Sequence, residues 1–313
     1  MTHFLSFVWN PSEGIQIGSF TLRFYSLMFV IAFALGWYLM APIFKREEEP
    51  QEKLDSLFVY MVVSILLGAR LGHVIFYQPE LFTTDPLSVF LPFHFVPEFK
   101  FSGFQGLASH GAAIAVIIAM YLYKTRILKR SYLWILDRIV IPVASGAIFV
   151  RLGNFFNSEI YGPVTSGDHF YAVKFVRETE FWEDQSPNFI TKTNDIDKAY
   201  DLIQNDPRFI DTLNAIPFRH PAQMYEAVGY VFVFALLMFM YWKTDARKKT
   251  GLLFGTFLVT LFSIRILVES VKESQGGFEE MKMFNLLTTG QWLSIPFVIV
   301  GIYLIFKAKK ETV

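Results

Sequence analysis

Apolar runs of about 20 residues recur along this chain, and a helix of that length crosses the hydrocarbon core of a bilayer. Strands of membrane barrels show instead alternating segments of about 10 residues, a pattern that this sequence lacks. The residues are 53% hydrophobic and 18% aromatic, well above the composition of a soluble domain. The sequence therefore predicts an all-α polytopic membrane protein.

Seven apolar segments are long enough to be membrane helices. Between the fourth and the fifth, a polar and acidic insertion at residues 163–218 interrupts the pattern. Its turn residues and mixed periodicity predict a small, partly ordered head and no further span. Residues 1–313 are expected to form one membrane-embedded domain that carries this head. The predicted spans are Phe24–Phe44, Leu54–Tyr77, Gly106–Tyr123, Leu133–Val150, Ala222–Trp242, Gly251–Glu269 and Trp292–Phe306.

Lysine and arginine residues in the short loops gather on one side of these spans. Such residues are enriched in cytoplasmic loops, so the N-terminus and the head are expected outside and the C-terminus in the cytoplasm. Residues 1–18 lack the basic region of a cleavable signal peptide, so the first helix is expected to remain. The basic groups lie around Lys45–Lys53, Lys124–Arg130, Lys243–Lys249 and Lys307–Lys310.

Net charge and cysteine content exclude several classes of function. The net charge is +0, which argues against a nucleic-acid partner held by bulk charge. The chain has no cysteine, which excludes disulfides, cysteine nucleophiles, thiolate metal sites and palmitoylation. No histidine pair has the spacing of a zinc site, so no metal is expected.

Polar side chains inside the predicted spans fall at one depth, near the outer ends of the helices. The inner half of the spans is nearly pure hydrocarbon, apart from Asp137 and Arg138. A channel or proton relay would need polar groups along its whole length, whereas a pocket at the outer leaflet needs them only here. The residues in this layer are Tyr25, Arg70, His110, Arg151, Asn154, Asn157, Glu159, Gln223, Tyr225, Glu226, Arg265 and Glu269.

These polar groups also have structural interpretations. Arg265 and Glu269 are four residues apart and could form an ion pair on one helix face. His110 could be hydrogen-bonded between helices, and the adjoining Gly111–Ala113 could form a close-packing face. Asn154 could cap a helix end. The number of arginines favours a ligand, because three guanidinium groups exceed what the local carboxylates must neutralise.

Arginines and asparagine amides that converge near the headgroup plane suit a phosphate ester. A guanidinium group donates two fixed, parallel hydrogen bonds to phosphate oxygens. A histidine in the same layer can accept a proton from an attacking nucleophile. From the residues alone, the prediction is a site that handles phospholipid, with or without catalysis.

The motifs closely resemble those of prolipoprotein diacylglyceryl transferases. The central motif is Arg151-Leu152-Gly153-Asn154-Phe155-Phe156-Asn157, followed by Glu159 and Gly162. The other matching motifs occur in family order and extend over nearly all the spans. They are Arg23–Met28, Gly68–Gly72 with Tyr77, Ser109–Gly111, Leu136–Arg138, Arg219–Glu226 and Arg265–Glu269.

This resemblance implies seven membrane helices with a periplasmic head, in the bacterial inner membrane. It also implies transfer of the diacylglyceryl group of phosphatidylglycerol to the lipobox cysteine of a preprolipoprotein signal peptide, the first step of lipoprotein maturation. A thioether forms and glycerol phosphate leaves. The reacting thiol belongs to the substrate, which accounts for an enzyme without cysteine, and no cofactor is implied.

The resemblance also assigns residues to roles. Arg151 and Arg265 are implied to hold the phosphate and to stabilise its developing charge, with Glu159 beside them. His110 and Tyr25 are implied to handle protons, and the identity of the base stays open among these two residues, Glu159 and water. The implied substrate-binding residues are Arg70, Arg151, Asn154, Asn157, Gly162, Gln223, Tyr225, Glu226, Arg265 and Glu269.

Three features depart from the family pattern. Ala112 stands where a second glycine is common, Ser26 stands where glycine is usual, and the insertion is long and acidic. None of them changes a charged position. Two other functions share the same residues: a phospholipid headgroup hydrolase that uses water, and a non-catalytic protein that binds lipid or signal peptides.

Overall fold

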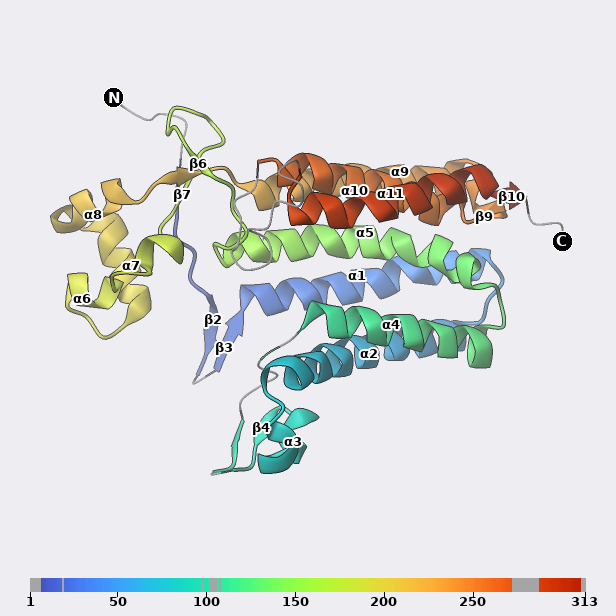
Figure 1. Cartoon of the computed structure of the whole chain (residues 1–313), viewed down its shortest axis with the longest axis horizontal. Coiled ribbons are helices and arrows are strands. Elements are labelled where there is room, and N and C mark those ends of the chain that lie inside the picture. Colours follow the sequence, from blue (N-terminus) through green and yellow to red (C-terminus); the bar gives the residue numbers. More distant parts are fainter. Residues whose placement is uncertain are drawn as a thin grey trace. The chain divides into compact units, whose positions relative to one another are not determined.

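Seven long helices carry the apolar runs in the computed structural model, which describes residues 7–18, 20–96, 98–101, 106, 108–271 and 287–310. Within these residues, the seven are long and apolar enough to cross a membrane, which confirms the predicted fold class. The helices are α1 (Phe24–Arg46), α2 (Gln51–Tyr77), α4 (Ser109–Tyr123), α5 (Tyr132–Phe156), α9 (Ala222–Lys243), α10 (Leu252–Glu269) and α11 (Thr289–Lys307) (Figure 1).

The chain forms two compact units, whose boundaries fall within α1 and α5. The first unit comprises Met1–Gly36 and Ile139–Val313, and the second comprises Trp37–Arg138. The polar residues of the predicted outer layer are therefore divided between them. Arg70 and His110 belong to the second unit, and the others belong to the first.

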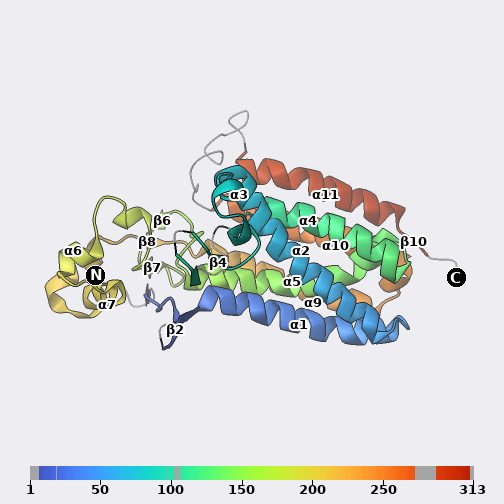
Figure 2. The ribbon, with the colours of Figure 1, turned by 90° about the horizontal axis from the view of Figure 1, so that it is seen from below.

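Close contact between α2 and α4 holds the second unit together, and Figure 2 shows these helices side by side. A Cβ atom on Gly111 of α4 would lie 2.7 Å from the Cα of Gly72 and would overlap the carbonyl oxygen of Gly68. Ala108 N also donates to Ala69 O at 2.9 Å. Small residues let membrane helices approach in this way, so the predicted close-packing face is confirmed at Gly111.

Replacing Gly111 with alanine is expected to destabilise the protein by about 1–3 kcal/mol, because the new methyl group meets backbone atoms that cannot rotate away. The measurement is the midpoint of thermal unfolding in detergent. Gly146→Ala in α5 is the matched control, since its Cβ would meet only the Cβ of Ala32, at 3.6 Å. A Gly111→Ala midpoint at or above that of the control would contradict the prediction.

Arg138, which the sequence places near the inner end of its span, makes structural contacts within the second unit. Arg138 Nη2 lies 3.1 Å from Glu47 Oε2, and its Nη1 donates to Trp134 O at 3.1 Å. The guanidinium carbon also lies 4.2 Å from the centre of the Trp134 ring. These contacts satisfy a buried arginine by pairing and stacking, as burial of a charge requires.

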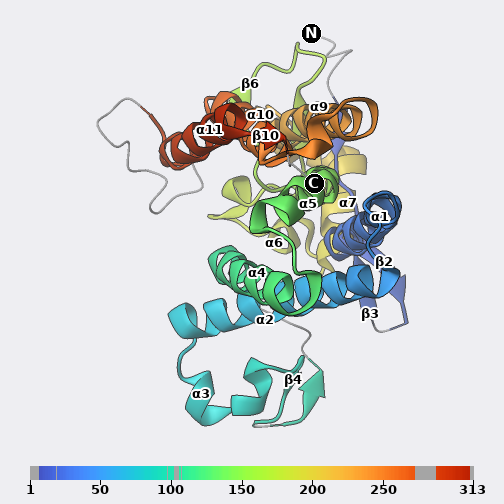
Figure 3. The same cartoon turned by 90° about the vertical axis from the view of Figure 1, so that its right-hand side faces the viewer.

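In the first unit, α10 packs between α9 and α11, as Figure 3 shows in a view along the helices. A Cβ atom on Gly255 would lie 2.8 Å from the carbonyl oxygen of Gly301, so α10 and α11 touch at their backbones. Thr288 and Gln291 form a capping box at the start of α11. Gln291 Nε2 also donates to Ile266 O at 3.1 Å, which fixes that end of α11 on α10.

The insertion between α5 and α9 folds with the N-terminal strand. Strand β1 (Phe7–Trp9) pairs in parallel with β7 (Val173–Phe175), and the order of the sheet is β1-β7-β8-β6. The sheet thus includes two parts outside the predicted insertion of 163–218, which are β1 and Arg219. The insertion contains β6 (Val164–Thr165), β7, β8 (Phe218–Arg219), α6 (Pro187–Thr191), α7 (Ile196–Asn205) and α8 (Ile210–Ala215).

Short elements connect the long helices. A hairpin of β2 and β3 leads directly into α1. Strand β9, just before α10, pairs with β10, just after α11. In the second unit, a small hairpin of β4 and β5 follows α3. Their bounds are β2 (Gly14–Ile17), β3 (Phe20–Arg23), α3 (Leu81–Thr84), β4 (Phe93–His94), β5 (Lys100–Phe101), β9 (Lys249–Thr250) and β10 (Lys309–Lys310).

Candidate active site

The end of α5 carries the central motif. The predicted end of the span at Val150 is wrong, because the helix continues to Phe156. Asn154 therefore lies on the helix and does not cap it. Ser158 N donates to Phe155 O and Glu159 N to Asn154 O, both at 3.1 Å, and Ser158 has a φ of 53°. This is a Schellman motif with serine in the left-handed position that usually takes glycine, and it turns Glu159 back over the helix.

A chain of hydrogen bonds joins the polar side chains at this helix end. Arg151 Nη1 donates to Asn154 Oδ1 at 3.2 Å, and Asn154 Nδ2 donates to Glu159 Oε1 at 2.7 Å. Asn157, which is exposed, donates to the same carboxylate oxygen at 3.4 Å. Polar residues can continue a membrane helix here because they satisfy one another.

The first turn of α9 supplies two more of the predicted residues. Glu226 Oε2 lies 2.6 Å from Arg151 Nε, and the two side chains are only 1% and 12% exposed. Gln223 is fully buried and its Nε2 donates to the backbone oxygen of Glu159 at 3.2 Å. The contact to Glu226 neutralises Arg151, so this arginine is paired within the protein.

Tyr25 reaches the same cluster from the start of α1. A Cβ atom on Gly153 would lie 2.9 Å from Cδ2 of Tyr25 and 3.6 Å from Cβ of Met28, so the glycine lets α1 approach α5 closely. The Tyr25 hydroxyl lies beside the Asn154 side chain, and the charges of Glu159 and Arg151 act on it. The structure thus brings a phenol against the arginine and carboxylate of the central motif.

Tyr230 of α9 is a member of the cluster that the sequence analysis missed. Its side chain is 3% exposed, and its hydroxyl contacts the Arg151 guanidinium. The charges of Glu226, Arg151 and Arg265 all act on it. The available signal was the spacing of four residues from Glu226, which places both side chains on one helix face.

Arg265 and Glu269 do not form the local pair that their spacing allows. Among the residues that the structure describes, no ion pair joins Arg265 to Glu269 or to another carboxylate. The Glu269 carboxylate instead lies against Gly290 in the first turn of α11, where a Cβ atom would be 2.9 Å from Oε2. The N-terminus of a helix is a favourable place for a negative charge.

Gly162 and Tyr225 contact the loop before α9. Gly162 N donates to His220 O at 2.7 Å, and a Cβ on Gly162 would lie 2.8 Å from the Cβ of His220, so the contacts of this glycine are packing contacts. The Tyr225 hydroxyl lies 3.1 Å from His220 Nδ1. Burial lowers the pKa of His220, and the nearby His169 lowers it further, so this imidazole is uncharged at neutral pH.

The second unit holds the two remaining predicted residues. Arg70 is buried in α2, and its Nη2 donates to Ser88 O at 3.1 Å, which fastens the loop after α2. His110 is exposed in the first turn of α4. An exposed imidazole at a helix start is accessible to a ligand. This position differs from the interpretation in which His110 is hydrogen-bonded between helices.

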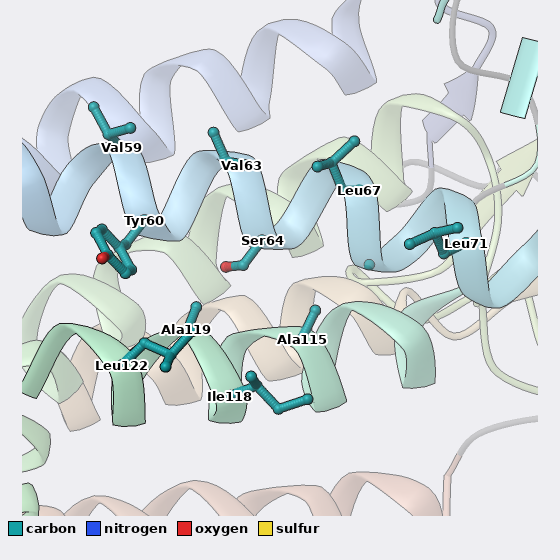
Figure 4. Close-up of a pocket in the computed structure, with 11 residues that line it drawn as sticks. Val59, Tyr60, Val63, Ser64, Leu67, Leu71, Ala115, Ile118, Ala119 and Leu122 are labelled. Carbon is teal, nitrogen blue, oxygen red and sulfur yellow. The ribbon is translucent and has the colours of Figure 1, made fainter. Parts of the chain in front are cut away.

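A groove of about 380 Å³ runs between α2 and α4 in the second unit (Figure 4). Its polar side chains are Tyr60 and Ser64, and Ser64 Oγ donates to Met61 O at 3.1 Å within its own helix. The groove has no charged side chain, so it offers nothing to a phosphate. It is lined by Val59, Tyr60, Val63, Ser64, Leu67, Gly68, Leu71, Ala115, Ile118, Ala119 and Leu122.

Comparison with known proteins finds one matching family model and many relatives. The model of the family described as prolipoprotein diacylglyceryl transferase matches residues 13–307. The phosphatidylglycerol–prolipoprotein diacylglyceryl transferase of Chloroherpeton thalassium is 35% identical over 304 residues, 97% of this chain and 94% of the relative. Proteins of the same name from Bacteroides fragilis (35% identity; 99% of this chain, 98% of the relative) and Porphyromonas gingivalis (37%; 90% and 89%) are similarly related.

Proposed function

The chain belongs to the prolipoprotein diacylglyceryl transferase family, and from this premise we propose that it transfers the diacylglyceryl group of phosphatidylglycerol to prolipoproteins. This transfer is the first step of lipoprotein maturation. The family match extends over residues 13–307, nearly the whole chain, and this range includes the cluster at the end of α5. The sequence, the fold and the relatives all support an enzyme of this class.

The acceptor is the thiol of the lipobox cysteine in a prolipoprotein signal peptide. Its sulfur attacks the glyceryl carbon that carries the phosphate of phosphatidylglycerol. The C–S bond of the thioether forms as the C–O bond to the phosphate breaks, the thiol gives its proton to a base, and glycerol phosphate leaves. The chain has no cysteine, so the only reacting thiol is that of the acceptor.

One observation of the structure carries the assignment of the phosphate site. Arg265 lies within electrostatic reach of Tyr230, which also contacts Arg151, and Arg265 has no carboxylate partner among the described residues. We assign the phosphate of the lipid to Arg265, with Arg151 oriented beside it. Developing negative charge on the leaving phosphate is stabilised by fixed guanidinium donors in a site of low dielectric constant.

Proton transfer has candidates in both units. Tyr25 contacts the Asn154 amide beside Glu159, and His110 is the exposed imidazole of the second unit. An imidazole nitrogen can accept the proton of a thiol, so we propose His110 as the first candidate for the base. Tyr25 and Glu159 are then assigned to the polar network that holds the site of bond cleavage.

The protein is a multi-pass membrane protein of a bacterial family. We place it in the inner membrane, with its N-terminus and the insertion outside and its C-terminus in the cytoplasm. The distribution of basic residues among the short loops supports this orientation. It puts the cluster on the side where a secreted signal peptide and the outer-leaflet lipid meet.

The experiment that tests this function uses purified protein in detergent, phosphatidylglycerol and a synthetic lipobox peptide. Peptide mass and glycerol phosphate release are measured together, and we expect a diacylglyceryl mass gain matched by glycerol phosphate. Glycerol phosphate without modified peptide would show a hydrolase. Neither signal, from folded protein, would show a protein that binds lipid or signal peptide without catalysis.

A further inference from the structure

Tyr230 lies one turn below Glu226 on the face of α9 that meets Arg151. Glu226 is 1% and Tyr230 is 3% exposed, so the face they share is covered by protein. The Arg151 guanidinium forms an ion pair of 2.6 Å with Glu226 and also contacts the Tyr230 hydroxyl. A polar side chain so deep in a membrane helix is expected to have a function or an obligatory partner.

Helix α10, which carries Arg265, packs against the same turn of α9. A Cβ atom on Gly229 would lie 2.7 Å from Cγ2 of Ile264, so α10 packs directly against the backbone next to Tyr230. Arg265 follows Ile264 in the chain, and its charge acts on the Tyr230 hydroxyl together with that of Arg151. The hydroxyl therefore lies where the electrostatic influences of the two arginines meet.

The donors of Arg151 are largely committed to protein groups. A guanidinium group has five N–H donors in a fixed plane. Nε lies 2.6 Å from Glu226 Oε2, Nη1 donates to Asn154 Oδ1 at 3.2 Å, and the guanidinium also contacts the Tyr230 hydroxyl. These contacts restrain the orientation of the Arg151 guanidinium.

We propose that Tyr230 is a positioning residue of the transferase, which holds the Arg151 guanidinium in the plane that receives the leaving phosphate. This inference rests on the proposed function, because it needs Arg151 to act on that phosphate. Glu226 neutralises the charge of Arg151, and Tyr230 fixes the orientation of the Arg151 guanidinium. A small misplacement of a catalytic group is enough to lower a rate by about 100-fold.

The test replaces Tyr230 with phenylalanine, which removes the hydroxyl and keeps the ring. We expect kcat to fall about 10- to 100-fold, with the KM for phosphatidylglycerol changed less than about threefold, because the contact acts when charge develops on the phosphate. Tyr241→Phe is the matched control, since Tyr241 is a fully buried tyrosine farther along α9. That variant is expected to keep wild-type kcat.

A second measurement separates positioning from a purely structural role. In the Arg151→Lys background the loss from Tyr230→Phe is expected to shrink to about threefold or less, because the group that it orients is gone. A full loss in that background, or a loss seen equally in Tyr241→Phe, would overturn the proposal, as would wild-type kcat in Tyr230→Phe. Failure of the proposed function would show differently, as absence of transfer by the wild-type protein itself.

Discussion

Replacing Arg265 with alanine is expected to lower the rate of diacylglyceryl transfer about 100- to 1,000-fold, which is the usual cost of losing one fixed donor to a developing anion. Thermal unfolding in detergent is expected to change little, because no carboxylate among the described residues depends on this guanidinium for its charge balance. The measurements are the initial rate with saturating lipid and the unfolding midpoint of the same preparation.

Two further variants make the Arg265 result specific. Arg265→Lys keeps the charge but not the planar pair of donors, so its rate is expected to lie between those of wild type and Arg265→Ala. Arg247→Ala removes an arginine from the loop between α9 and α10 and is expected to keep the wild-type rate. A fully active Arg265→Ala protein would contradict the assignment of the lipid phosphate to this residue.

The second large effect is expected at Arg151, where activity and stability fall together. In Arg151→Ala the Glu226 carboxylate, which is 1% exposed, loses the cation 2.6 Å away. An unpaired buried charge costs about 3–5 kcal/mol, so the unfolding midpoint is expected to drop markedly as transfer is lost. Arg151→Lys is expected to impair transfer as well, because an ammonium group cannot reproduce the fork of donors.

A double variant separates the two roles of Arg151. Combining Arg151→Ala with Glu226→Gln removes the stranded charge, so most of the lost stability is expected to return while transfer stays absent. Recovery of transfer in the double variant would show that Arg151 acts only by neutralising Glu226. An unchanged unfolding midpoint in the single Arg151→Ala variant would contradict the burial of this ion pair.

Much of the site was predictable because the polar residues stand out against the apolar spans. Tyr25, Arg151, Asn154, Glu159, Gln223 and Glu226, all predicted from the sequence, meet in the first unit. Tyr230 was not predicted, since its spacing of four residues from Glu226 is a weak signal in a helix rich in aromatic residues. Only the contact across to α5 distinguishes it from the other aromatic residues of α9.

The end of α5 shows why a hydropathy boundary can be wrong. The run of apolar residues stops at Val150, yet the helix continues for more than a turn. Its polar residues remain helical because Arg151, Asn154 and Glu159 bond to one another and to α9. Hydropathy measures the transfer of single side chains, whereas the stability of this turn depends on partners that are distant in the chain.

The sequence by itself determined the seven helices, because an apolar segment in a bilayer must satisfy its backbone hydrogen bonds internally and has almost no other fold. It also identified which residues are too polar for hydrocarbon and therefore need a partner or a function. Only the tertiary structure decided how their charges pair. Local spacing favoured Arg265 with Glu269, but packing placed Glu226 on Arg151 and Glu269 on the start of α11. Such pairing depends on the register between helices, which no local spacing in the chain encodes.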